Sequence, residues 1–204
     1  RTRRLRAGQW AAAAVLVIGG PSAPRVLAQD IVPFPFIETA IENGSPLWWE
    51  AVGERTLRLH LLYDHERGAS NRAAGHIHIR FHAPTGTTWA LEFTNLLNIW
   101  NGRPGSVAPE MKILVISADG RTWCPVPVEM VHSNLVRSTI AVTSSPVWIA
   151  RMAPYRLSDL QRLLDELRVR PGVRIELIGR SAEGRPLEMV SLGPERPAHS
   201  FVVR

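Results

Sequence analysis

The sequence has one cysteine, Cys124, among its 204 residues. A single cysteine excludes a disulfide within the chain, so packing and hydrogen bonds must stabilise it in any compartment. Cys124 stands between Trp123 and Pro125, and no activating base lies near it in the sequence. We therefore expect a small buried apolar side chain and not a nucleophile.

A long hydrophobic run is also missing. The apolar run Trp10–Ile18 is shorter than the roughly 20 residues of a membrane-spanning helix. A basic segment, Arg1–Arg6, precedes it, and the small-residue site Val26-Leu27-Ala28 follows. This order is typical of an export signal, so we expect cleavage after Ala28 and a periplasmic or extracellular protein. The alternatives are an uncleaved N-terminal anchor and, if the segment does not function, a cytoplasmic protein.

The positive charge is unevenly distributed along the chain. The net charge is +6, but residues 1–28 hold five of the 24 basic residues and no acid. The remainder has 19 basic and 18 acidic residues, and such a nearly neutral body matches a phosphate backbone poorly. Nucleic acid is therefore not expected as a partner.

Between Asp30 and Met152 the sequence consists of short runs with the alternating polarity of β-strands. Turn-forming residues such as Pro84-Thr85-Gly86 and Asp119-Gly120 separate the runs, and no helix of ordinary length is indicated. Several such strands predict an antiparallel β-sandwich over residues 29–152. The strands are expected at 57–61, 76–82, 89–94, 111–117, 135–144 and 147–152.

Helical spacing begins only after residue 153. Ser158 is predicted to be the N-cap, with Gln161 completing a capping box, and leucines follow at helical spacing until Pro171-Gly172. Two strands are then expected, at 173–177 and 187–192, joined by a reversal at 181–186. A third strand is expected at 199–204.

Two motifs in this part carry a resemblance to a known family. The first is P-Y-x-x-S-D-L-x-x-L-L from Pro154, and the second is I-G-R-S-x-E-G-R-P-L from Ile178. Together they resemble the opening of the catalytic domain in zinc metallocarboxypeptidases of the carboxypeptidase A superfamily. The resemblance implies an α/β domain with a mixed sheet, a peptide or protein substrate, and one Zn²⁺ held by two His and one Glu. A metal-bound water, activated by a glutamate base, would then attack a C-terminal peptide or amide bond.

A looser resemblance covers the preceding strands. It rests on Trp89-x-x-x-Phe93-x-Asn95-Leu96, on Asp119-Gly120-x-x-Trp123 and on Val147-Trp148-Ile149-Ala150. These segments are similar to the β-sandwich that precedes the catalytic domain in the cytosolic-carboxypeptidase branch of the superfamily. The expected export signal disagrees with the cytosolic location that the name of this branch suggests.

Three histidines, His76, His78 and His82, share one face of the predicted strand 76–82. His76 and His78 could approach a common metal ion, because residues two apart in a strand point the same way. No cysteine or carboxylate completes a ligand set at metal-site spacing, so we expect a solvated outer face. The seven tryptophans are expected to supply core volume and not a carbohydrate-binding surface.

Charged residues in the motif that begins at Ile178 have a plainer interpretation. Arg180, Glu183 and Arg185 are expected to be solvated or to pair locally at the turn, and the resemblance implies that they shape the hairpin. His199 does not fit the family's first zinc motif, H-x-x-E, because Val202 stands three residues later.

The sequence therefore predicts a mixed fold with three parts: an export signal or anchor (1–28), a β-sandwich (29–152), and the start of a carboxypeptidase-like catalytic domain (153–204). The whole protein would be an exported zinc metallocarboxypeptidase. No catalytic, cofactor-binding or metal-ligating residue is assigned within 1–204, so this chain is expected to be inactive and to bind no zinc. The alternative is a secreted β-sandwich that works as a binding module without catalysis.

Overall fold

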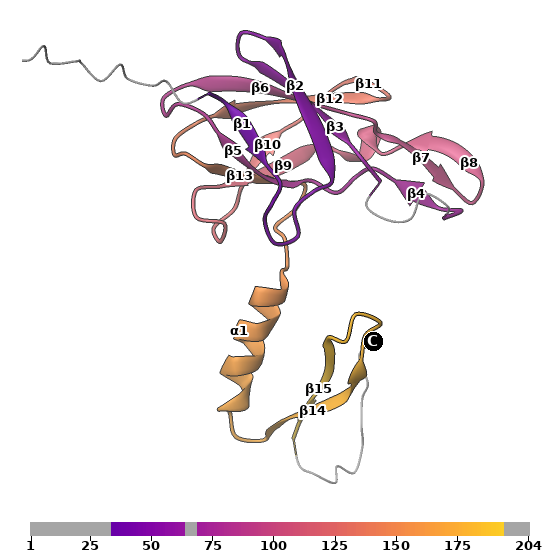
Figure 1. Cartoon of the computed structure of the whole chain (residues 1–204), viewed down its shortest axis with the longest axis vertical. Helices are drawn as coiled ribbons and strands as arrows, with labels where there is room; N and C mark the ends of the chain where they lie inside the picture. The colour runs from indigo at the N-terminus through magenta and orange to yellow at the C-terminus, as the bar shows by residue number, and fades with distance from the viewer. Residues whose placement is uncertain (1–33, 64–68, 194–204) are drawn as a thin grey trace, which may run out of the picture. The chain divides into compact units, whose positions relative to one another are not determined.

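The computed structural model describes residues 34–63 and 69–193 (Figure 1). The predicted export signal, the predicted strand at 199–204 and His199 lie outside the described residues. Two five-stranded sheets and a smaller three-stranded sheet form the β-rich part of the chain, and an α-helix and a hairpin follow them in sequence.

The first sheet has the strand order β1-β5-β13-β9-β10, and every neighbouring pair in it is antiparallel. Side chains alternate across this sheet, so that Ile79 and Phe81 face the core while His78, Arg80 and His82 lie on the outer face. The strands are β1 (Phe36–Glu38), β5 (His78–His82), β9 (Ile113–Ser117), β10 (Cys124–Pro127) and β13 (Val147–Ala150).

The second sheet has the strand order β11-β12-β6-β3-β2. Its strands β3 and β6 run parallel, with Leu57 opposite Leu91 and Leu59 opposite Phe93, so the prediction of a wholly antiparallel sandwich is wrong at this pair. Alternation shows which face of a strand is buried but not its direction, and β5 of the other sheet intervenes between these two strands. The strands are β2 (Leu47–Gly53), β3 (Thr56–Leu61), β6 (Thr88–Thr94), β11 (Glu129–His132) and β12 (Leu135–Ala141).

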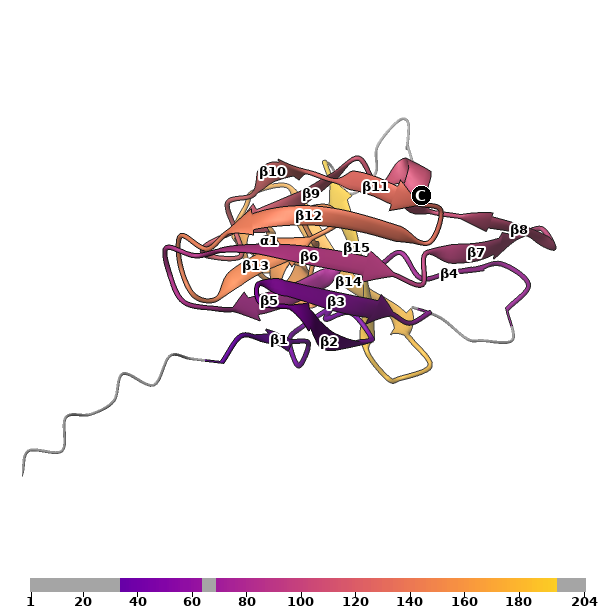
Figure 2. The same cartoon turned by 90° about the horizontal axis from the view of Figure 1, so that it is seen from above.

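The strands of the two sheets overlap in the view of Figure 2, and one hydrophobic core lies between their inner faces. Phe81 of the first sheet meets Trp89 of the second edge to face, with their ring centroids 5.8 Å apart. Each fully buried Leu, Ile or Phe contributes roughly 1.5–3 kcal/mol relative to its exposed state. The largest fully buried side chains are Leu57, Leu59, Leu61, Ile77, Ile79, Phe81, Leu91, Phe93, Leu96, Met111, Leu114 and Ile140.

A smaller sheet and a short helical turn extend from this core. The sheet has the order β4-β7-β8, with strands β4 (Arg72–Ala73), β7 (Leu97–Trp100) and β8 (Arg103–Ser106), and the 3-10 turn η1 spans Ala108–Glu110. Trp100 is 65% exposed here and Trp48 of β2 is 50% exposed. The prediction that the tryptophans fill the core is therefore right for Trp89 and wrong for these two.

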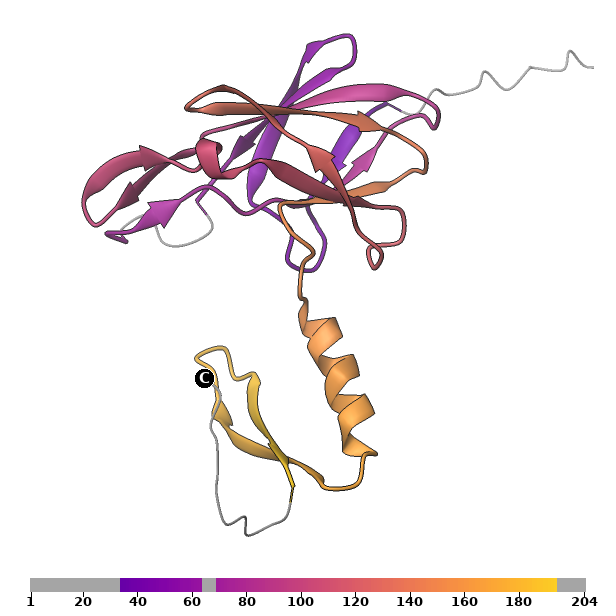
Figure 3. The same cartoon turned by 180° about the vertical axis from the view of Figure 1, so that it is seen from behind.

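The helix α1 spans Leu157–Arg168, close to where leucine spacing predicts it (Figure 3). Its N-cap is Arg156, and the Asp159 carboxylate accepts hydrogen bonds from the Arg156 backbone N–H and side chain. The predicted capping box of Ser158 and Gln161 is wrong, because Ser158 already lies inside the helix and Gln161 hydrogen-bonds Asp165.

An antiparallel hairpin of β14 (Val173–Arg180) and β15 (Pro186–Leu192) follows the helix, as the two predicted strands require. Its turn is closed by a hydrogen bond from the Ser181 N–H to the Arg185 carbonyl, 2.9 Å long. Leu164 of α1 is buried, but the large apolar side chains Leu177, Ile178 and Leu192 remain 58%, 64% and 75% exposed. Over the part of the chain that the structure describes, no helix is long and apolar enough to cross a membrane.

Candidate functional site

The polar contacts that connect the sandwich with α1 begin at a tight turn, residues 39–45, between β1 and β2. A Cβ atom at Gly44 would lie 2.1 Å from the Thr39 carbonyl oxygen, so only glycine fits there. Ser45 fastens the turn to the strand β5, because its N–H donates to the His78 carbonyl and its hydroxyl donates to the His76 carbonyl. Asn43, which precedes Gly44 in the turn, has a φ of +60°.

Two histidines converge on the carbonyl oxygen of Asn43. His76 Nε2 lies 2.9 Å from it and His78 Nδ1 lies 3.0 Å from it. Because a carbonyl oxygen only accepts, each of these ring nitrogens carries a proton and donates. The neutral His78 ring therefore has its lone pair on Nε2.

The His78 side chain is buried, which corrects the expectation of a solvated histidine face. Its exposed fraction is 0%, and its ring stacks on Trp148 with a centroid separation of 5.6 Å and meets Trp123 at 6.3 Å. Its Nε2 atom has no hydrogen-bond partner among the described residues. Burial lowers the pKa of His78 below its ordinary value of 6.5, and the positive charge of Arg156 acts in the same direction.

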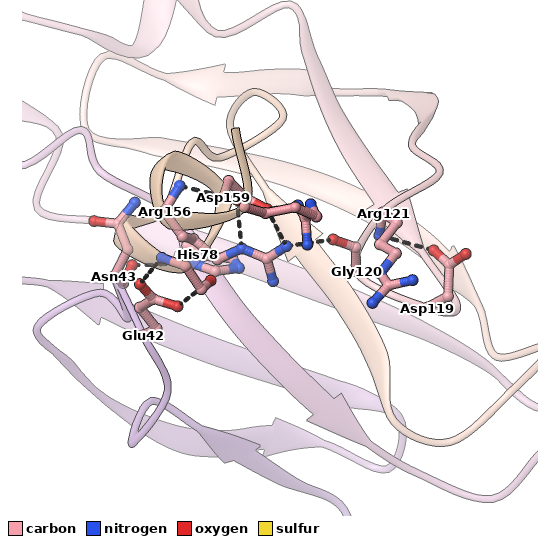
Figure 4. Close-up of polar contacts among 10 residues, drawn as sticks. Glu42, Asn43, His78, Asp119, Gly120, Arg121, Arg156 and Asp159 are labelled. Carbon is pink, nitrogen blue, oxygen red and sulfur yellow. Dashed lines mark hydrogen bonds and ion pairs between the residues drawn. The ribbon is translucent and has the colours of Figure 1, made fainter. Parts of the chain in front are cut away.

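Glu42, next to Asn43 in the turn, holds the first turn of α1 (Figure 4). Its carboxylate accepts hydrogen bonds from the Ser158 N–H at 2.8 Å and from the Ser158 hydroxyl at 2.6 Å. These bonds, with the hydroxyl bond contributing most, lower the pKa of Glu42. Residues 116 positions apart in sequence thus meet at the start of the helix.

A second contact joins Arg156 to the loop after β9. Its guanidinium donates to the Gly120 carbonyl at 3.2 Å and also to Asp159. Gly120 has a φ of +68°, and a Cβ atom there would lie 3.1 Å from the Trp148 ring. The loop is fixed by Asp119, whose carboxylate accepts the N–H groups of Thr122 and Arg121; these hydrogen bonds lower its pKa to about 2.

Three hollows flank these contacts. One, of about 500 Å³, lies between the Gly120–Trp123 loop and α1 and is lined by Trp123, Tyr155, Arg156 and Arg162 among others. Another, of about 380 Å³, is lined by Glu42, Asn43, Arg156 and Arg185. The third, of about 450 Å³, is lined by Asn43, His76 and Tyr155 among others. His78 lines none of the three, so its buried lone pair is not placed to act on a ligand there.

The described residues do not form a zinc site. Within residues 34–63 and 69–193, no three His, Cys, Asp or Glu side chains gather as metal ligands would. His82 donates to the Glu38 carboxylate at 2.8 Å and stacks on Phe36. It therefore has different partners from His76 and His78, which both donate to the Asn43 carbonyl.

The remaining candidates have local roles or different surroundings. Arg185 pairs with Glu183 at 2.6 Å, and Arg180 donates to the Gly184 carbonyl at 2.8 Å. Cys124 is exposed, so the expectation of a buried thiol is wrong. It begins β10, an edge strand of the first sheet.

Sequence reasoning missed a row of charges on the outer face of the second sheet. Cross-strand register places Glu129, Arg137, Glu92, Arg58 and Glu50 side by side on its five strands. The signs alternate along the row, and both arginines donate to Glu92. In the sequence, each of these strands shows only one isolated charged residue in an outward position. The row cannot be predicted from these residues until the order of the strands in the sheet is known.

Comparison with known proteins gives solved structures only. A scan against protein-family models found no match, and a search of the curated proteins found none. A metallo-carboxypeptidase from Burkholderia cenocepacia matches 81% of this chain and 41% of its own, with a TM-score of 0.66 and 18% identity. A putative carboxypeptidase A from Shewanella denitrificans matches 80% of this chain and 41% of its own, with a TM-score of 0.66 and 21% identity.

A third similar structure is a metallo-carboxypeptidase from Pseudomonas aeruginosa, in complex with (2-guanidinoethylmercapto)succinic acid. It matches 76% of this chain and 39% of its own, with a TM-score of 0.58 and 20% identity. The chain thus shares the fold of part of these carboxypeptidases and spans about two-fifths of their length.

Proposed function

We propose that this chain is the N-terminal part of an exported zinc metallocarboxypeptidase, consisting of its β-sandwich and the first elements of its catalytic domain. The observation that carries the proposal is the fold shared with solved metallo-carboxypeptidases over about four-fifths of this chain. The substrate would be a peptide or protein, cleaved at its C-terminal end.

The exposed apolar surface of α1, β14 and β15 supports this proposal. The apolar side of the hairpin carries Leu177 and Leu192, and Leu160 and Leu163 of α1 are 37% and 43% exposed. A two-stranded sheet is marginal by itself, and such a surface is normally covered by other elements. We infer that further strands and helices of the catalytic domain cover it in the whole protein, and that these elements supply the zinc ligands.

The test is to express the complete reading frame of the gene and to compare it with residues 1–204. We expect H-x-x-E and a later histidine beyond Arg204, one zinc per molecule, and release of C-terminal amino acids from peptides. The 204-residue chain alone should bind no stoichiometric zinc and cleave nothing. A frame that lacks these ligands, or a full-length protein without zinc and activity, would refute the proposal.

A second candidate is a secreted binding module in which the sandwich is the working part. The exposed Trp48 and Trp100 favour it, since exposed aromatic side chains are common in binding surfaces. Saturable binding of cell-wall glycan or peptide by the 204-residue chain, abolished by Trp48→Ala or Trp100→Ala, would support this candidate.

A further inference from the structure

A run of hydrogen bonds connects β5 with the first turn of α1. His78 donates from Nδ1 to the carbonyl of Asn43, and the neighbouring Glu42 accepts from the N–H and hydroxyl of Ser158. We call these four residues the clasp. Ser45, at the end of the turn that carries Glu42 and Asn43, hydrogen-bonds the backbone of β5 and fixes that end of the turn. The position of the tip, Glu42 and Asn43, depends on the hydrogen bonds from His76 and His78.

The site of His78 accommodates a neutral ring and not a charged one. Nε2 faces no acceptor among the described residues, and the ring lies against Trp148 and Trp123. A protonated ring would add a buried N–H without a partner and a positive charge, both of which are costly in apolar surroundings.

The charged groups on the elements around His78 do not offset that cost. The neighbouring His76 and the Arg156 guanidinium both disfavour a positive charge on His78, and the carboxylates of Glu42 and Asp159 are hydrogen-bonded to Ser158 and Arg156. The strand β5 also carries Arg80 and His82, which pair with Glu38, and Arg151, directly after β13, pairs with Glu110. Asp119 and Arg121 lie on the loop that bears Trp123.

We propose that the clasp is an acid-sensitive device, which holds α1 on the sandwich while His78 is neutral and releases it when His78 gains a proton. The proton goes to Nε2, and the charged ring must then leave the face of Trp148 to reach water. The Asn43 carbonyl then keeps only the exposed His76 as a donor, the tip of the turn opens, and Glu42 moves away from Ser158.

The direction of the pH effect follows from the lowered pKa of His78. Since the closed state binds fewer protons than the open state, closure weakens as the pH falls below 6.5 toward the pKa of the buried ring. The carboxylate of Glu42 has a pKa below its ordinary 4.5 and therefore stays charged over the upper part of this range. Opening above pH 4.5 is accordingly assigned to His78.

The experiment uses the 204-residue chain labelled with ¹⁵N and follows two signals by NMR between about pH 7.5 and 4.5. One is the titration of the His78 ring, and the other is the amide exchange of Ser158, corrected for the intrinsic pH dependence of exchange. We expect Ser158 protection to fall about tenfold or more with the same midpoint as His78. Titration of His78 without loss of Ser158 protection, or with a different midpoint, would overturn the proposal.

Two substitutions provide a matched comparison. Asn at position 78 can donate near the Nδ1 position but cannot be protonated, so His78→Asn should stay closed down to pH 4.5. His82→Asn removes a histidine of the same strand that bonds Glu38 instead, and it should open as the wild type does. Acid opening of His78→Asn with the wild-type midpoint would contradict the proposal.

Glu42→Ala supplies the exchange rate of the open state, because Ser158 then has no carboxylate acceptor. If His78→Asn does not close at neutral pH, the coincidence of the two wild-type midpoints still decides the question. The inference goes beyond the proposed peptidase activity, and its test needs neither zinc nor substrate.

Discussion

Glu92 is the residue on which the charged row of the second sheet depends. Its side chain is 5% exposed, whereas its partners Arg58 and Arg137 are 36% and 41% exposed. Burial alone would raise the pKa of Glu92, but the hydrogen bonds from Arg137 and Arg58 outweigh it and keep the pKa below 4.5. The carboxylate is therefore charged and paired at neutral pH.

Replacing this carboxylate should destabilise the chain. In Glu92→Gln, two arginines lose their common acceptor charge, and we expect a loss of about 1–2 kcal/mol in the free energy of unfolding. The value stays moderate because both arginines reach solvent. Urea unfolding, with an unchanged dependence on denaturant, measures it.

Glu50→Gln is the matched control at the exposed end of the same row. Glu50 is 46% exposed and bonds only His60 among the described residues, so the change should cost less than about 0.5 kcal/mol. Equal effects of the two substitutions would show that burial of Glu92 between the arginines is not the source of its contribution.

At the scale of elements, the start of α1 depends on Asp159. As the third residue of the helix it accepts the Arg156 N–H, which would otherwise be an unsatisfied donor of the first turn. Its negative charge also lies at the positive end of the helix dipole. The paired guanidinium of Arg156 lowers the pKa of Asp159 far below 3.8, so this cap is intact throughout the neutral range.

Asp159→Asn should weaken the first turn of α1 by about 1 kcal/mol, because the cap loses its charge and one strong acceptor. Amide exchange over Leu157–Arg168 measures the effect as faster exchange in the first turn. Gln161→Ala tests the capping box that the sequence suggested, and it should leave the first turn unchanged. Faster first-turn exchange in Gln161→Ala than in Asp159→Asn would contradict the observed cap.

At the scale of the whole molecule, the two five-stranded sheets bury their apolar faces, whereas α1 and the hairpin do so only in part. Val173, Ile175 and Leu177 alternate with Arg174 and Glu176, so β14 has one apolar and one polar side. Register places Leu192 and Val190 on the apolar side. Exposed apolar surface next to unpaired strand edges favours association.

The 204-residue chain should therefore self-associate in a concentration-dependent manner. Leu177→Lys combined with Leu192→Glu should raise the monomer fraction several-fold, because both side chains lie on the apolar side of the hairpin. Sedimentation velocity over a range of concentrations measures this. Arg174→Glu combined with Glu176→Lys, on the polar side, is the control with unchanged net charge. A fully monomeric wild-type chain would refute the prediction.

The local elements could be predicted from the sequence alone. Alternation placed most strands, and leucine spacing with Pro171-Gly172 placed α1, because both depend on which residues of a short segment can be buried together. The motifs after residue 153 also indicated the carboxypeptidase-like fold that the solved structures share. The domain boundaries and the export signal stay predictions.

Features that depend on contacts between distant segments could not be predicted from the sequence and required the three-dimensional arrangement. The parallel pairing of β3 with β6, the burial of His78 under Trp148, and the meeting of Glu42 with Ser158 all join residues far apart in sequence. The pattern of one strand shows which side faces inward, but not which side chains cover its other face. For that reason the sequence predicted a solvated His78 and a capping Ser158. In the structure, Trp148 and the turn at residues 39–45 contact His78, and Glu42 of the same turn accepts the hydrogen bonds of Ser158.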